Sequence, residues 1–202
     1  MIRTLIFDFG DVFINLDKSA TIREMQKLNI EDLSEELVQI NMDYEKGLIS
    51  SDAFLATYLK SLTSLTKPQI IACWNAILID FPKYRYNFLK LLSEKGYYKL
   101  ILLSNTNELH INWVKENIPF YEEFVACFDA FYFSHEINFR KPDSAIYKFV
   151  LDKHDLKPEE CLFIDDTKLN TEAASALGIH TWNIDPSKED IIDLFTSNRQ
   201  LF

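Results

Sequence analysis

Short apolar runs that end in polar side chains are the feature of this chain that most restricts its fold. Three runs end at Asp8, at Ser104-Asn105 and at Asp165-Asp166, and two more span Ala130–Phe133 and Ile179–Trp182. Such runs are typical of strands that are buried on both faces. After residue 84 helical patterns alternate with them, which favours a parallel sheet covered on both sides. The sequence therefore predicts an α/β fold with a doubly wound parallel sheet.

One block of the chain lacks any strand pattern. Between about residues 18 and 80 the apolar side chains recur at helical spacing, and Gly47 falls between two of the helical stretches. The block is long enough for a small bundle of helices. We therefore expect a core domain of residues 1–15 and 82–202, into which residues 16–81 are inserted as a small helical lobe.

Glycine is scarce, and this excludes two common kinds of nucleotide site. Only four glycines occur, well apart from one another, at Gly10, Gly47, Gly96 and Gly178. The dinucleotide-binding loop and the P-loop both need clustered glycines so that phosphate can approach the backbone. A phosphate site in this chain must therefore be built differently. Gly96 and Gly178 are expected to end helices, and Gly47 to form a turn.

Charge and cysteine content exclude further classes. The formal net charge of −10 argues against a nucleic-acid binder, since affinity for the phosphate backbone rests on Lys and Arg. The three cysteines, Cys73, Cys127 and Cys161, lie far apart and suggest no disulfide framework. No apolar run is long enough to span a membrane, and Asp8 comes too early for a secretory signal. We expect a cytoplasmic protein without nucleic-acid or membrane partners.

Acidic residues gather where the predicted strands end. If the strands are neighbours, Asp8, Asp11, Asp165 and Asp166 meet at the edge where ligands bind in such sheets. Carboxylates at that spacing repel one another unless a cation joins them, and oxygen ligands of this kind suit Mg²⁺. The simpler alternative is that each acid caps the following helix or faces water.

Lys141 supplies a positive charge close to another predicted helix start. It stands in the segment Arg140-Lys141-Pro142-Asp143, and Asp143 is placed to cap the following helix. Its ammonium group could neutralise a phosphoryl group or keep a carboxylate nucleophile ionised. Alternatively, Arg140 and Lys141 form a solvated pair on the surface.

Taken in order, four motifs resemble those of the haloacid dehalogenase superfamily, and within it the phosphatases. The first is Leu5–Val12, in which Asp8 matches the nucleophilic aspartate, and the second is Leu102–Asn105, in which Ser104 matches the phosphate-binding residue. The third is Lys141 with its neighbours. The fourth is Phe163–Asn170, where the acidic pair Asp165-Asp166 is followed by Asn170. The helical block sits where this family inserts its small helical cap.

The resemblance implies a Rossmann-like core and a Mg²⁺-dependent phosphatase that forms an aspartyl-phosphate on Asp8. The metal would be held by Asp8, the backbone carbonyl of Gly10 and Asp166, while Asp165 would act through water or on Lys141. Ser104, Asn105 and Lys141 would bind the phosphoryl group, with Asn170 in support. The expected substrate is a small phosphorylated metabolite, such as a sugar phosphate or a nucleotide-like phosphomonoester. Whether the protein is a monomer or a homodimer stays open.

One position departs from the pattern. Most phosphatases of this superfamily carry a second Asp two residues after the nucleophile as the general acid and base, and here that position is Gly10. General acid–base catalysis is worth roughly 10²–10⁴-fold in rate. Some sugar-phosphate phosphatases that resemble this chain share the glycine, and Asp11 is a tentative substitute. Two alternatives are a catalytically impaired binding protein and a 2-haloacid dehalogenase, although a dehalogenase has no need of the acidic pair.

Overall fold

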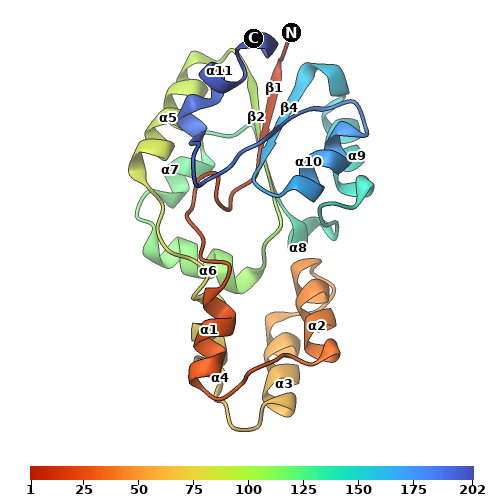
Figure 1. Ribbon diagram of the computed structural model, residues 1–202. Helices are drawn as coiled ribbons and strands as arrows, with labels where there is room; N and C mark the ends of the chain where they lie inside the picture. Colours follow the sequence, from red (N-terminus) through yellow and green to blue (C-terminus); the bar gives the residue numbers. More distant parts are fainter.

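The computed structural model describes residues 1–202 and has a five-stranded sheet at its centre (Figure 1). The strands are arranged in the order β3-β2-β1-β4-β5, and each neighbouring pair is parallel. Their bounds are β1 (Thr4–Phe7), β2 (Lys99–Ser104), β3 (Ala130–Phe133), β4 (Cys161–Asp165) and β5 (His180–Asn183). The predicted doubly wound parallel sheet is confirmed. The strand order reverses between β1 and β4, and ligands bind at such a point in folds of this kind.

Helices cover both faces of the sheet (Figure 1). Because successive side chains of a strand point to opposite faces, Phe7 packs into one apolar cluster and Ile6 into another. The first cluster lies under α5, α6, α7 and α11, and the second under α9 and α10. The helices are α5 (Lys83–Lys95), α6 (Glu108–Asn117), α7 (Tyr121–Val125), α8 (Ser134–Ile137), α9 (Ser144–His154), α10 (Lys168–Ser175) and α11 (Leu194–Ser197). Short 3₁₀ turns occupy Pro158–Glu160, Ile191–Asp193 and Arg199–Leu201.

Four further helices form a separate lobe, which we call the helical lobe (Figure 1). They are α1 (Ala20–Lys27), α2 (Glu35–Glu45), α3 (Ser51–Ser61) and α4 (Lys67–Asn75), and they enclose an apolar cluster of their own. The two segments that connect the lobe to the core run side by side, with an antiparallel bridge between Leu16 and Leu78. The lobe faces the edge of the sheet at which the strands end (Figure 1).

Some local expectations hold and others do not. Helix α5 ends at Gly96, whose φ of 62° is the left-handed geometry that favours glycine. The regular part of α10 ends at Ser175, and Gly178, with a φ of 84°, closes its last turn as expected, because the Gly178 N–H bonds to the Ser175 carbonyl and the Ile179 N–H to the Ala174 carbonyl. Asp143 precedes α9, but its side chain caps nothing and pairs with Lys46 of the helical lobe instead. None of the helices combines the length and the apolar character needed to cross a membrane.

Candidate active site

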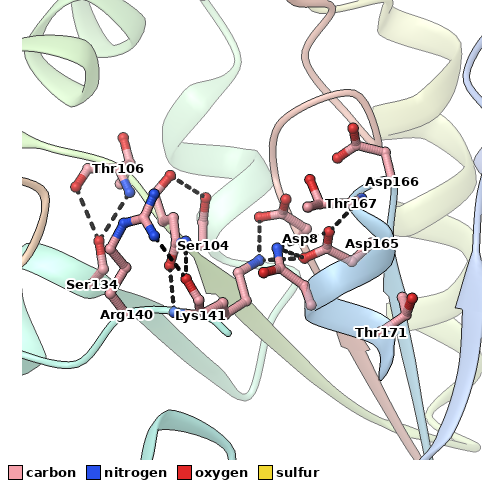
Figure 2. Close-up of polar contacts among 12 residues, drawn as sticks. Asp8, Ser104, Thr106, Ser134, Arg140, Lys141, Asp165, Asp166, Thr167 and Thr171 are labelled. Carbon is pink, nitrogen blue, oxygen red and sulfur yellow. Dashed lines mark hydrogen bonds and ion pairs between the residues drawn. The ribbon is translucent and has the colours of Figure 1, made fainter. Parts of the chain in front are cut away.

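The polar residues predicted at the ends of three neighbouring strands lie close together at the carboxyl edge of the sheet (Figure 2). Asp8 directly follows β1, Ser104 ends β2 and Asp165 ends β4, and β1 is hydrogen-bonded to both other strands. All three residues are buried. The aligned register of parallel strands is what brings these distant segments of the chain together.

Lys141 lies between two of these carboxylates. It comes from the loop between α8 and α9 and is fully buried, with its Nζ 2.8 Å from Asp8 Oδ1 and 2.6 Å from Asp165 Oδ2. Burial lowers the pKa of the ammonium group, but the attraction of Asp165 and Asp8 outweighs burial and leaves that pKa raised. The group therefore stays charged, and Lys141 is not part of a solvated surface pair.

Asp8 is a buried carboxylate whose pKa is raised by its surroundings. Burial raises its pKa to about 7, against the attraction of Lys141 and with added repulsion from Asp165. An ionised Asp8 is therefore costly in this pocket, and Lys141 reduces that cost. A cation beside Asp8 would reduce it further.

Asp165 has no free bonding capacity. Its carboxylate accepts bonds from Lys141 Nζ, from the Thr167 backbone N–H at 2.8 Å and from Asn170 Nδ2 at 3.0 and 3.1 Å. Both oxygens are thus held by the protein itself. This arrangement favours the expected role of Asp165 as the residue that holds Lys141, and it places Asn170 in direct contact with Asp165.

Asn105 holds Lys141 from the other side. Its Oδ1 accepts a bond from the Lys141 backbone N–H at 2.9 Å, and its Nδ2 donates to the Lys141 carbonyl at 2.9 Å. The side chain that we expected to bind phosphate is therefore bonded to the Lys141 backbone. The Ser104 hydroxyl, by contrast, makes only a 3.5 Å contact with the Asn105 carbonyl and keeps the capacity to donate to a ligand.

The acidic residues can hold a divalent cation. One carboxylate oxygen each of Asp8, Asp165 and Asp166 lies within 4.8 Å of the other two, and because the oxygens of Asp165 already accept protein hydrogen bonds, Asp8 and Asp166 are the carboxylates left to ligate. Burial raises the pKa of Asp166 too, although Lys18 opposes the shift. A set of hard oxygen donors next to an open cavity fits Mg²⁺, which keeps coordination positions for water and substrate oxygens.

Asp11, the tentative acid–base residue, is bonded to its own neighbours in the structure. Asp11 has a φ of 54°, its Oδ1 accepts the Leu16 backbone N–H at 3.0 Å, and its Oδ2 lies 3.1 Å from Lys18 Nζ. Asp11 does not line the cavity that contains Asp8. A Cβ on Gly10 would lie 2.7 Å from Leu16 Cδ1, so Leu16 fills the space beside the glycine. This placement does not support Asp11 as the substitute catalyst.

Three charged residues of the site had no clear signal in the sequence. A cavity of about 310 Å³ contains Asp8, and Lys18, Glu45 and Arg140 line it as well. Lys18 contacts Asp166, while Arg140 Nε donates to Glu45 Oε2 at 2.7 Å. Lys18 and Glu45 belong to the part of the chain that we expected to form the cap, and their distance from Asp8 depends on how that part docks. The adjacency of Arg140 to Lys141 was the one available hint.

A smaller cavity of about 110 Å³ adjoins the first, and His110 is on its wall. Gly10, Leu16, Glu45 and Asn105 line both cavities.

The Nε2 atom of His110 lies 3.1 Å from the Trp74 carbonyl oxygen, and its Nδ1 atom lies 3.1 Å from Asn107 Nδ2. Because a carbonyl only accepts, the neutral ring donates from Nε2 and accepts at Nδ1. Burial lowers the pKa of His110 to about 4, so the ring is neutral at physiological pH.

The fold and the site agree with the comparison with known families. A model of the haloacid dehalogenase-like hydrolases matches residues 2–178. The chain therefore belongs to this family of hydrolases.

Individual relatives show which kinds of enzyme in this family the chain resembles. The chain is 28% identical to the D-ribitol-5-phosphate phosphatase of Bacteroides thetaiotaomicron, over 90% of this chain and 91% of the relative. A family enzyme of the same organism, crystallised with magnesium and inorganic phosphate, has a TM-score of 0.85 and 36% identity, over 96% of this chain and 100% of the other. A family hydrolase of Porphyromonas gingivalis has a TM-score of 0.84 and 29% identity, with 98% and 97% covered. An L-2-haloacid dehalogenase shares the fold alone, with a TM-score of 0.62 and 17% identity. The comparison therefore indicates a phosphatase.

Proposed function

We propose that this chain is a Mg²⁺-dependent phosphatase for a small phosphorylated metabolite, with Asp8 as the nucleophile. The observation that carries the proposal is the fully buried Lys141, which lies between Asp8 and Asp165. A cation in that position keeps the Asp8 carboxylate ionised and partly neutralises an incoming phosphoryl group.

The reaction follows from the placement of the side chains. An oxygen of Asp8 attacks phosphorus, the bond from phosphorus to the leaving-group oxygen breaks, and an aspartyl-phosphate forms. Water then hydrolyses this intermediate, which releases inorganic phosphate and restores Asp8. Phosphoryl transfer depends mainly on positioning and electrostatics, and both are provided here by buried groups.

Each neighbouring residue has a defined part. Asp165 holds Lys141 against Asp8, and the Ser104 hydroxyl donates to a phosphoryl oxygen. Bound Mg²⁺, held by Asp8, Asp166 and the Gly10 carbonyl, would draw charge from the phosphoryl oxygens.

The leaving group would lie between Asp8 and the helical lobe. We propose that residues 16–81 act as the cap that shapes this space, because Lys18 and Glu45 line the cavity that contains Asp8. The D-ribitol-5-phosphate phosphatase among the relatives supports a sugar or polyol phosphate as the substrate.

A panel of phosphate monoesters, assayed for phosphate release with Mg²⁺ and with a chelator, tests the proposal. We expect Mg²⁺-dependent turnover of at least one sugar phosphate, and loss of that turnover in Asp8→Asn. Asp152→Asn changes an exposed carboxylate on α9 and serves as the matched control.

Two results would overturn the phosphatase proposal. One is chloride release from 2-haloacids without hydrolysis of any phosphate ester, which would indicate a dehalogenase. The other is binding of a fluoride analogue of phosphate without any turnover, which would indicate a binding protein impaired at Gly10.

A further inference from the structure

Glu45 occupies a place in the site for which the proposed reaction gives no role. It is the last residue of α2, and its side chain lines both the 310 Å³ cavity with Asp8 and the adjoining 110 Å³ cavity. Its backbone carbonyl accepts a bond from Ser134 Oγ of the core at 2.6 Å. The core therefore fixes the position of Glu45 directly.

Arg140 holds the Glu45 carboxylate by only one of its oxygens. Arg140 Nε donates to Glu45 Oε2 at 2.7 Å, and Arg140 Nη1 donates to the Lys141 carbonyl at 3.1 Å. Glu45 Oε1 and Arg140 Nη2 have no hydrogen-bond partner within the protein. The side chains are 26% and 30% exposed, so neither is sealed from a ligand in the cavity.

An acceptor and a donor fixed next to each other are complementary to hydroxyl groups. A hydroxyl can donate to the free carboxylate oxygen, while a neighbouring hydroxyl oxygen accepts from the free guanidinium nitrogen. Only two of the 13 residues that line this cavity are hydrophobic. An apolar leaving group would displace water from these polar groups and leave them unpaired, which is costly.

We infer that Glu45 and Arg140 are specificity-determining residues that bind hydroxyl groups of the leaving group. The substrate class is then the phosphate monoesters of polyols and sugars, in which hydroxyls stand on adjacent carbons. The inference rests on the proposed phosphatase function. A cavity of about 310 Å³ is at the lower end of the usual range for ligand sites, which favours a single small leaving group.

The same ion pair also joins the helical lobe to the core, so a purely mechanical role must be separated from recognition. Asn138 serves as the control for docking, because its Nδ2 donates to the carbonyls of Lys46 at 2.9 Å and Gly47 at 3.3 Å. Asn138 docks the same turn of the lobe but does not line the cavity that contains Asp8. Its replacement weakens docking without removing a group that faces the leaving group.

The experiment compares two substrates of equal chain length, a pentitol 5-phosphate and pentyl phosphate, which lacks the hydroxyls. We expect Glu45→Met to lower kcat/KM for the pentitol phosphate by about 10- to 100-fold, the usual effect of lost hydrogen bonds to a charged group. The value for pentyl phosphate should change by less than about threefold. Glu45→Gln keeps its oxygen for Arg140 and presents an amide N–H group from which a hydroxyl can accept, so it should restore most of the preference, whereas Asn138→Ala should affect both substrates equally.

Equal losses on the two substrates in Glu45→Met would overturn the inference and assign the ion pair to docking alone. An unchanged preference in that variant would overturn it as well, and so would a parent enzyme that prefers pentyl phosphate. The proposed phosphatase function fails separately, if the parent hydrolyses no phosphate ester in the presence of Mg²⁺.

Discussion

Replacing Lys141 by Met tests the electrostatic core of the site. Methionine keeps much of the volume of the lysine stem but removes the charge that lies 2.8 Å from Asp8 Oδ1 and 2.6 Å from Asp165 Oδ2. The variant leaves two buried carboxylates without their cation. Removing one partner of a buried ion pair typically costs about 3–5 kcal/mol.

This cost should appear in the thermal stability of the metal-free protein. For a chain of this size, each kcal/mol corresponds to roughly 2–4 °C, so we expect the midpoint of unfolding to fall by roughly 6–20 °C. Calorimetry or circular dichroism in the presence of a chelator measures it. Activity should be lost as well, because Asp8 becomes harder to ionise.

The pH dependence separates lost charge from lost packing. Without Lys141, the pKa of Asp8 in the folded variant should lie further above its unfolded value. The folded variant then binds more protons than the unfolded chain, so its stability decreases as the pH rises through that pKa. The deficit relative to the parent should therefore be larger at pH 8 than at pH 5. A deficit below about 1 kcal/mol at pH 8, or one that is equal at both pH values, would refute the reasoning.

Two other predictions concern residues that line the two cavities. Gly10→Ala places a Cβ 2.7 Å from Leu16 Cδ1, the free end of a half-buried side chain that can turn aside, so the free energy of unfolding should fall by less than about 1 kcal/mol. In a double-mutant cycle, Leu16→Ala should remove that small penalty, and a loss above about 2 kcal/mol that Leu16→Ala leaves unchanged would contradict this account. For His110, whose folded pKa of about 4 lies below its unfolded value, stability should be lost as the pH falls from about 6.5 to 4, by about 3 kcal/mol. His110→Gln should lack this loss in denaturant titrations, and equal pH profiles for parent and variant would count against a buried neutral ring.

The residues whose convergence could be predicted from the sequence are those whose positions follow from the sheet. Asp8, Ser104 and Asp165 come together because parallel strands in register end at the same edge, and apolar runs of strand length are visible in the sequence. Lys141 was found by its motif, but its complete burial was not predictable. That burial depends on hydrogen bonds that Lys141 donates to Asn105 and Asp165, which lie far away in the sequence.

The residues that were missed depend on how the helical lobe meets the core. In the sequence, Glu45 looks like any acidic residue near the end of a helix. It reaches Arg140 only because α2 docks on the segment that contains Ser134. Asp143 shows the same limit in the opposite sense. Its position before α9 predicted that its side chain would cap the helix. In the structure the carboxylate forms an ion pair with Lys46 of the helical lobe and does not cap α9.

The charge of the site explains how a protein with a net charge of −10 can bind a phosphate ester. Three cations and three anions line the cavity that contains Asp8, namely Lys18, Arg140 and Lys141 against Asp8, Glu45 and Asp166. Asp165 and Asp11, which pair with Lys141 and Lys18, bring the local sum to −2, and acids on the distant surface are screened over about 10 Å. A phosphate monoester carries about −2 at neutral pH and would be repelled by such a site. One divalent cation neutralises the local sum, so the binding of phosphate and the binding of Mg²⁺ should be strongly cooperative.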